Sequence, residues 1–346
     1  MEKQGRIAWI DALLGFTMWL VVIEHVQFFG GCQGMIYNTL IAWFFMPLFF
    51  FVSGLVMYHP ARCWSARTVV SYLWKKVLQI LVPTTIMFIL ANWIIGYNIV
   101  EQFLNPMKAG YWVTITLFGF IALYVLFGWL MQVCKSGEKV WLSVLLLLTA
   151  LVSFLLSRHG LYTALFGEKV MVFFDTLQVG KWCYFQFFVL GIIFRKYQDV
   201  FLQLINNRYA IGIVLVAYIF MAIVCTNGLP FVGVQRYAAA ASSRLIPYTG
   251  ILIVTTLFYS LRRFLSDSKT GHALCIVGQN TLGIYLIHYF FLPGNWTYLQ
   301  LLAANTPPHF ANNYIHNSSR SNYMLLFDCN TDNSAQSATC EIFDRG

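Results

Sequence analysis

The sequence has few charged residues and no cysteine motif. Charged residues make up 10% of its 346 residues, whereas 59% are hydrophobic. That balance leaves too little polar surface for a soluble domain of this length, which excludes an ordinary soluble enzyme. The eight cysteines are scattered without a Cys-x-x-Cys pair, so we expect neither a zinc site nor a disulfide framework. The sequence also lacks a basic motif interleaved with aromatic residues, and we expect no nucleic-acid partner.

Long apolar segments fill most of the chain and predict an all-α, polytopic bundle of transmembrane helices in a lipid bilayer. A hydrophobic stretch of about 17 to 25 residues crosses a bilayer as a helix, and about nine such spans are present. The predicted spans are Ile7–Phe29, Tyr37–Tyr58, Val77–Tyr97, Tyr111–Val133, Val140–Leu156, Val170–Phe194, Ala210–Cys225, Leu245–Leu261 and Ala273–Leu292. The first span lacks a small-residue cleavage site, so we expect it to stay in the mature protein.

Lysine and arginine residues gather in alternate connecting segments. Cytoplasmic loops retain these residues, whereas outer loops carry fewer of them. With the N-terminus inside, the inner segments hold Lys3, Arg6, Arg62, Arg67, Lys75, Lys76, Lys135, Lys139, Arg195, Lys196, Arg208, Arg262, Arg263 and Lys269. The outer loops hold Lys108, Arg158, Lys169, Arg236 and Arg244. The basic residues of the inner segments, here called the inner collar, account for most of the net charge of +9 and predict a cytoplasmic N-terminus.

The composition changes after Pro293. Residues 294–346 are rich in Asn, Ser and Thr and lack the apolar period of a helix or a strand. We therefore divide the chain into a transmembrane domain, residues 1–293, and a polar, disordered tail, residues 294–346. A natural tail and the product of a reading-frame shift both fit this composition.

The first predicted span contains three titratable side chains, Asp11, Glu24 and His25. Acids and histidines inside a membrane are costly and mark a functional site by default. Asp11, Leu14 and His25 share one helix face by their spacing of three and four residues. From Leu14 to His25 the helix rises roughly 16 to 17 Å, about half the hydrocarbon thickness. His25 should therefore lie in the outer half of the membrane, within reach of the cytoplasm only for a long, thin group.

Each of these residues has a structural and a functional interpretation. His25 is either a histidine that packs helices together or, because imidazole titrates near neutrality, a general base or acyl carrier. Asp11 either complements the helix macrodipole near the N-terminus or orients the site. Glu24 points about 100° away from His25 around the helix, so we expect it to face a neighbouring helix or the substrate.

Several motifs, taken in order, resemble the membrane-bound acyltransferase family 3. The first reads Arg6-x-x-Trp9-Ile10-Asp11-Ala12-Leu13-x-Gly15 and ends in His25. The others run from Met46 to Gly54, from Tyr72 to Pro83, from Gly110 to Thr114, from Phe187 to Lys196 and from Leu282 to His288. Each motif is weak alone, but their order and spacing over residues 6 to 293 are fairly specific.

The resemblance implies transfer of an acyl group, usually acetyl, from cytoplasmic acyl-coenzyme A to a hydroxyl of a surface glycan, a glycolipid or a related acceptor. It implies a donor substrate, acyl-coenzyme A, rather than a permanently bound cofactor, and a location in a bacterial inner membrane. A pantetheine arm entering from the inner face would carry the thioester towards His25. We expect His25 to be the strongest candidate for a catalytic residue and Asp11 to be the next strongest.

Basic residues of the inner collar are candidates for binding the donor. Lys75 and Lys76 lie within the third motif, and Arg67 precedes it. They would hold the coenzyme phosphates at the cytoplasmic face, although a lysine pair in this place also acts as a topology signal.

Three further residues are candidates for the acceptor side: Ser53, Glu24 and His288. The hydroxyl of Ser53 could lie near the oxyanion, or Ser53 and Gly54 could simply let two helices pack closely. His288 lies near the outer end of the last span, either as an interface residue or as a second wall of the acceptor cavity.

The sequence departs from the family pattern in three places. Leu14 stands where the family has an arginine or lysine, and Gln79 stands where members often carry another basic residue. The polar tail stands where the family, usually of ten spans, runs a last helix. Loss of a charge-assisted contact costs about 1.5 to 3 kcal/mol, one to two powers of ten in rate or affinity.

Three hypotheses follow. The chain is an O-acyltransferase, a proton-coupled transporter-like protein that uses Asp11, Glu24 and His25, or a catalytically impaired or truncated family member. Coupling to a proton gradient would favour the second hypothesis, and indifference to His25→Ala would favour the third.

Overall fold

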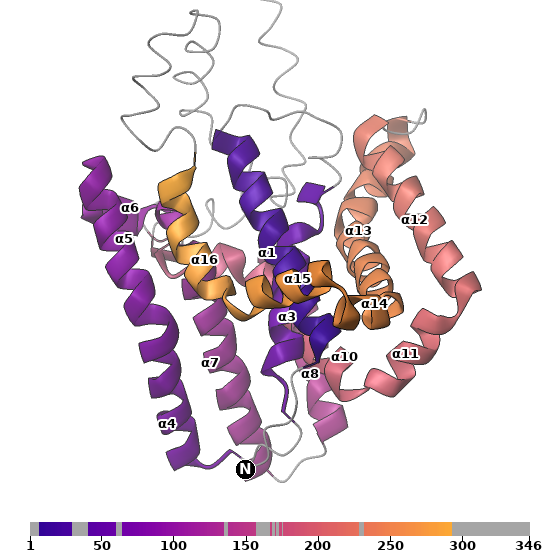
Figure 1. Ribbon diagram of the computed structural model, residues 1–346, viewed down its shortest axis with the longest axis horizontal. Helices are drawn as coiled ribbons and strands as arrows, with labels where there is room; N and C mark the ends of the chain where they lie inside the picture. Colours follow the sequence, from indigo (N-terminus) through magenta and orange to yellow (C-terminus); the bar gives the residue numbers. More distant parts are fainter. Residues whose placement is uncertain are drawn as a thin grey trace, which may run out of the picture.

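The computed structural model describes residues 7–29, 41–59, 64–134, 138–156, 176–227 and 232–292, and also residues 167, 170, 173 and 174. Every regular element in these ranges is a helix, which confirms the predicted all-α bundle (Figure 1). The predicted tail, residues 294–346, lies outside the described residues, so its predicted disorder stays a prediction.

The helices follow one another with short connections. The first half contains α1 (Ala8–Phe29), α3 (Phe45–Met57), α4 (Ala66–Lys76), the π-helix η1 (Val77–Leu81), α5 (Val82–Ile95), α6 (Ile99–Leu104), the 3-10 turn η2 (Lys108–Gly110), α7 (Trp112–Val133) and α8 (Glu138–Leu156). The second half contains η3 (Val179–Tyr184), α10 (Phe185–Lys196), α11 (Gln198–Asn206), α12 (Arg208–Asn227), α13 (Val232–Ser260), α14 (Arg262–Asp267), α15 (Lys269–Gln279), α16 (Thr281–Ile287) and η4 (His288–Phe291).

Four helical stretches in the described ranges are long and apolar enough to cross a membrane: Ala8–Val26, Ala66–Ile95, Trp112–Val133 and Tyr237–Ser260. The number rises to six if each of two bent helix pairs forms one span. Two shorter apolar helices, Phe45–Met57 and Leu142–Leu151, fall within further predicted spans. The structure thus has the helices of a multi-pass membrane protein, and the count of nine spans stays a prediction.

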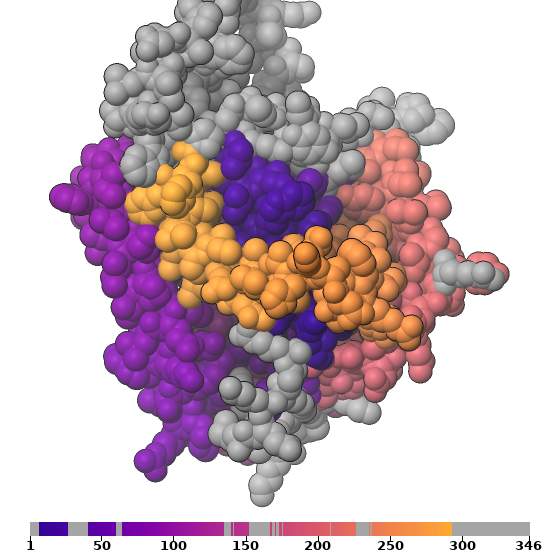
Figure 2. Space-filling view, viewed as in Figure 1, coloured from indigo at the N-terminus to yellow at the C-terminus, as the bar shows by residue number. Residues whose placement is uncertain are grey.

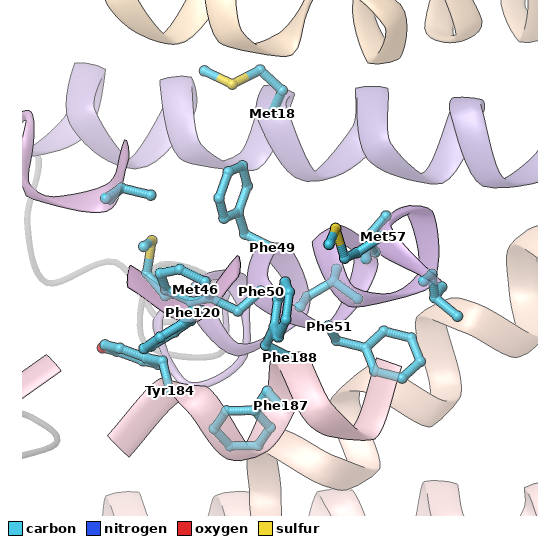
Figure 3. Close-up of a cluster of buried hydrophobic side chains, with 14 of the residues drawn as sticks. Met18, Met46, Phe49, Phe50, Phe51, Met57, Phe120, Tyr184, Phe187 and Phe188 are labelled. Atoms are coloured by element: carbon cyan, nitrogen blue, oxygen red, sulfur yellow. The ribbon is translucent and has the colours of Figure 1, made fainter. Parts of the chain in front are cut away.

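The core of the bundle is an aromatic cluster between α1, α3 and α10. Figure 3 shows consecutive phenylalanines of α3 lying between α1 and α10. The ring of Phe50 contacts those of Phe120 and Tyr184, with centroids 5.1 and 5.3 Å apart. Two glycines let the backbones approach, because a Cβ added at Gly54 or Gly191 would overlap a carbonyl oxygen of the facing helix. These contacts hold α3 and α10 in a fixed register.

The last described segment packs across α1. A Cβ added at Gly15 would overlap the backbone oxygen of Leu274, and one added at Gly278 would overlap that of Asp11. In Figure 2 the orange segment containing α14 and α15 crosses the face of the molecule over α1. After α15 the chain bends by 70° at Asn280, and α16 then runs beside the upper half of α1 (Figure 1). This bend carries η4 to the end of α1 that holds His25.

One continuous helix of 30 residues is formed by α4, η1 and α5. Its start is fixed by a capping box, in which the side chain of Ser65 accepts from Thr68 N and the side chain of Thr68 accepts from Ser65 N. The π-helical turn η1 lies just before Pro83, whose ring would clash with the carbonyl four residues earlier in a regular α-helix. The wider turn lets the helix continue past the proline.

Candidate active site

Two histidines from opposite parts of the sequence meet at the centre of the site. Nδ1 of His25, in α1, lies 2.9 Å from Nε2 of His288, in η4. Their rings stack with centroids 5.0 Å apart. His288 is buried, and His25 is partly exposed. The structure therefore brings together the residue predicted to be catalytic and one predicted for the acceptor side.

The hydrogen bonds around His288 fix the tautomer of both rings when the imidazoles are neutral. Nδ1 of His288 lies 2.6 Å from the carbonyl oxygen of Tyr285, which can only accept. Nδ1 of His288 therefore carries the proton and its Nε2 accepts from Nδ1 of His25. The lone pair of His25 is then on Nε2, where a general base needs it.

Two tyrosine hydroxyls converge beside His25 on one backbone carbonyl. Tyr285 and Tyr289 both donate to the oxygen of Gly110, Tyr289 over 3.1 Å. The Oη atom of Tyr289 also lies 3.3 Å from Nε2 of His25. Its ring packs on His288, with centroids 4.1 Å apart. Both ring nitrogens of His25 thus have a partner within the protein.

The Gly110 carbonyl is held by a strained turn. Lys108, Ala109 and Gly110 have consecutive positive φ angles of 46°, 49° and 92°. Lys108 and Ala109 carry a Cβ, and a positive φ is costly for such residues. Backbone strain of this kind is often found at functional sites. Lys108 is 1% exposed, and its ammonium donates to the carbonyl of Phe103 and lies 4.5 Å from the centroid of that ring. The turn is therefore anchored by a buried cation as well as by the two tyrosines.

Glu24 lies next to His25 in α1 and is half-buried. Its Oε2 atom is buried with no hydrogen-bond partner among the described residues. A buried carboxylate oxygen without a partner is costly, and such a group gains most from a ligand that brings hydroxyl donors. This placement fits its predicted part on the acceptor side, which stays a prediction.

Asp11 is not at this site. Its Oδ2 accepts a hydrogen bond of 3.1 Å from Nε2 of Gln279, across the contact of α1 with α15. It precedes His25 by 14 residues on one helix, a rise of about 21 Å. The two residues share a helix face as predicted, but that distance excludes direct contact, so a catalytic part for Asp11 stays a prediction without support from the geometry.

Ser53 makes a local hydrogen bond. Its hydroxyl donates to the carbonyl of Phe49 over 2.8 Å, the usual bond of a serine to the preceding turn of its own helix. The neighbouring Gly54 packs directly on α10. These contacts favour the helix-packing interpretation of Ser53 and Gly54 over a place near the oxyanion.

The predicted donor-binding cations lie at the other end of the bundle. Arg67 and Lys75 are exposed and Lys76 is half-buried, all on α4, which Figure 1 shows at the foot of the molecule. Phe88, twelve residues beyond Lys76 on the same continuous helix, contacts Tyr111 next to the site. At 1.5 Å per residue, Lys76 lies about 18 Å and Arg67 about 31 Å along the helix from the level of the site.

Sequence reasoning missed Tyr289, Tyr285 and Gly110 as members of the site. Tyr285 lies three residues before His288 and four before Tyr289, which directly follows His288, and this helical spacing was the available signal. For Gly110 no signal existed beyond its place at the start of another motif. Among the described residues, no group of three or more His, Cys, Asp or Glu side chains is arranged to hold a metal ion.

Comparison with known proteins gives one match. A model of acyltransferase family 3, described as an acyltransferase domain, matches residues 7–315. The match contains His25, Gly110, His288 and Tyr289, and it confirms the resemblance drawn from the motifs. Neither the comparison with curated proteins nor that with solved structures gave a match.

Proposed function

Because the chain belongs to acyltransferase family 3, we propose that it transfers an acyl group, such as acetyl, from acyl-coenzyme A to a hydroxyl of a surface glycan or related acceptor. The observation that carries the proposal is the hydrogen bond between His25 and His288. It directs the lone pair of a histidine to Nε2 at a place inside the membrane part of the chain. An imidazole held in one tautomer by its neighbour is suited to remove the proton of an acceptor hydroxyl.

The distance between the cations of α4 and the imidazoles of His25 and His288 supports a donor that enters from the α4 end of the bundle. The positive charges of α4 lie about 18 to 31 Å from the level of His25, at the end of the bundle where α1 begins. At the same end, the guanidinium of Arg262 lies over the ring of Tyr259, which contacts Trp9. Nucleotide phosphates would bind at this end, while the thin pantetheine arm would carry the thioester to His25.

The same charge distribution supports the proposed location. In a bacterial inner membrane with a cytoplasmic N-terminus, the cationic end would face the acyl-coenzyme A pool, as the positive-inside rule requires. His25 and Glu24 would then lie towards the outer face, where a glycan acceptor is exposed. Glu24, whose Oε2 atom has no partner among the described residues, would accept hydrogen bonds from acceptor hydroxyl groups.

The test is transfer of labelled acetyl from acetyl-coenzyme A to endogenous glycans in membranes that carry the full chain. His25→Ala should abolish the label while the protein accumulates in the membrane as before. His272→Ala is the matched control, because it removes an exposed histidine of α15 and should leave transfer unchanged. Label that persists in His25→Ala, or no label from either the native chain or Leu14→Arg, would contradict the proposal.

A further inference from the structure

We propose that Tyr289 is a further catalytic residue, which relays the proton of the acceptor hydroxyl to Nε2 of His25. This inference rests on the proposed acyl transfer and adds the path by which the proton leaves the acceptor. It depends on three observations. Both ring nitrogens of His25 face a protein partner, and the Tyr289 ring is held in place by its neighbours. The phenol proton of Tyr289 also has two acceptors within reach, the Gly110 oxygen and Nε2 of His25.

The first observation concerns access to the base. Nδ1 of His25 is bonded to His288, and Nε2 faces the hydroxyl of Tyr289 at 3.3 Å. An acceptor hydroxyl therefore meets no vacant ring nitrogen on His25. It must either displace Tyr289 or pass its proton through the Tyr289 oxygen.

The second observation is that the Tyr289 ring is held from several sides. It is 6% exposed and packs against His288, Tyr111 and Tyr285, with centroids 4.1, 5.3 and 6.1 Å away. Below the ring, the position of Gly110 leaves no room even for a Cβ. Displacing this ring would disturb the whole cluster, so passage through its oxygen is the route that the packing favours.

The third observation is that the phenol of Tyr289 has one proton and two acceptors at similar distances. The oxygen of Gly110 is 3.1 Å away and Nε2 of His25 is 3.3 Å away. Gly110 also accepts from Tyr285, so it stays hydrogen-bonded when the Tyr289 proton turns to His25. A phenol proton that can turn to Nε2 of His25 while the Gly110 carbonyl stays hydrogen-bonded is suited to a relay.

The proposed step balances in protons and electrons. The acceptor hydroxyl gives its proton to Oη of Tyr289 as the phenol proton of Tyr289 moves to Nε2 of His25. A lone pair of the acceptor oxygen forms the new bond to the thioester carbonyl carbon, and the carbonyl π pair moves onto its oxygen. Collapse of this intermediate breaks the carbon–sulfur bond, and the sulfur leaves with that electron pair and takes a proton from Oη of Tyr289 as the Nε2 proton of His25 returns to Oη. Both side chains return to their starting states, and the products are an ester and a thiol.

The test compares two phenylalanine variants that differ in one respect. Tyr289→Phe and Tyr285→Phe each remove one hydroxyl from the Gly110 carbonyl and keep the ring, but only Tyr289 also faces His25. With acetyl-coenzyme A as the donor probe, Tyr289→Phe should lower the transfer rate by about 100-fold or more, the usual scale of a proton-transfer residue, at equal protein in the membrane. Tyr285→Phe should lose less than about tenfold, the scale of one hydrogen bond.

Transfer rates in mixtures of light and heavy water give a readout that a merely structural role would not change. Two protons move together in the relay, so the native rate should fall along a curve as the deuterium fraction rises, and the residual rate of Tyr289→Phe should fall along a straight line. Equal losses in the two phenylalanine variants, or a straight line for the native chain, would overturn the relay. In that case a requirement for His25 would leave the acyltransferase proposal standing, whereas absence of transfer from every form would remove both.

Discussion

His25 and His288 are 263 residues apart in the sequence and 2.9 Å apart in the fold. Their contact is formed because α15 packs on the first half of α1 and the bend at Asn280 returns α16 along the second half. The base and its partner therefore come from the first and the last described segments. The site exists only when these two segments are docked.

Replacing His288 should reduce transfer without removing it. His288→Ala leaves the Nδ1 proton of His25 without its acceptor and frees the ring to adopt the other tautomer, so we expect a loss of about 10- to 100-fold. His288→Gln, which offers an oxygen to the same proton, should retain more activity. In a double variant with His25→Ala, the change at His288 should cause no additional loss, because both residues act through one base. Full activity in His288→Ala would contradict this pairing.

A second prediction concerns the turn beneath Tyr289. A Cβ at Gly110 would overlap the ring of Tyr289, so Gly110→Ala should displace the hydroxyl from His25 and lower the transfer rate by about tenfold or more. Gly96→Ala is the matched control, because Gly96 also has a positive φ, 80°, but no atom of the described residues lies within 4 Å of its added Cβ. Both variants carry the backbone strain of a left-handed alanine, and only one carries the clash. Equal rates in the two variants would show that the position of Tyr289 is unimportant.

The sequence predicted the all-α fold and, separately, the two histidines that meet at the candidate site. Apolar length alone predicted an all-α bundle, since backbone groups in lipid must be satisfied within helices. It did not predict the bend at Asn280 or the shortness of α3, because breaks inside apolar runs depend on packing against neighbouring helices. His25 and His288 were identified separately, since each is a titratable group in a membrane segment. Their partnership was not predicted, because it depends on contacts between distant segments.

Two other outcomes have clear physical reasons. Asp11 and His25 share a face, but helical periodicity says nothing of distance along the axis, and about 21 Å separates them. Gly110 belongs to the site because of positive φ angles at Lys108 and Ala109, which residues with a Cβ rarely adopt and which propensity does not anticipate. The sequence therefore could not predict that the Gly110 carbonyl accepts from both Tyr285 and Tyr289.

A third prediction tests the docking of α15 on α1. Gly15→Ala and Gly278→Ala each place a Cβ against the facing backbone, and we expect each to lower the free energy of unfolding by about 1 to 3 kcal/mol. Gly283→Ala, in α16, is the control, since its added Cβ meets no atom within 4 Å in the part of the chain that the structure describes, and alanine favours a helix. Thermal unfolding of the detergent-solubilised chain is the measurement. Unchanged midpoints in the first two variants would contradict the close packing of these helices.

The last prediction concerns Leu14, which stands where the family pattern has a cation. Leu14 is partly buried on α1, between the cationic end of the bundle and His25, and one turn of helix from Asp11. Leu14→Arg would add a positive charge on the path proposed for the donor, and a charge-assisted contact of about 1.5 to 3 kcal/mol corresponds to about 10- to 100-fold. We therefore expect a higher rate of labelled acetyl transfer, seen most clearly at low acetyl-coenzyme A concentration.

Leu14→Met is the matched control, because it keeps an apolar side chain of similar volume and should leave the rate near that of the native chain. A gain in Leu14→Arg alone would mean that the native chain has an intact site with a weakened hold on its donor. If neither variant gains and both accumulate normally, the cation is already supplied from α4, and Lys75→Gln or Lys76→Gln should then raise the acetyl-coenzyme A concentration needed for half-maximal transfer. If none of these four variants changes the transfer, the basic end of the bundle takes no part in donor binding. The lysines would then serve only to orient the chain in the membrane.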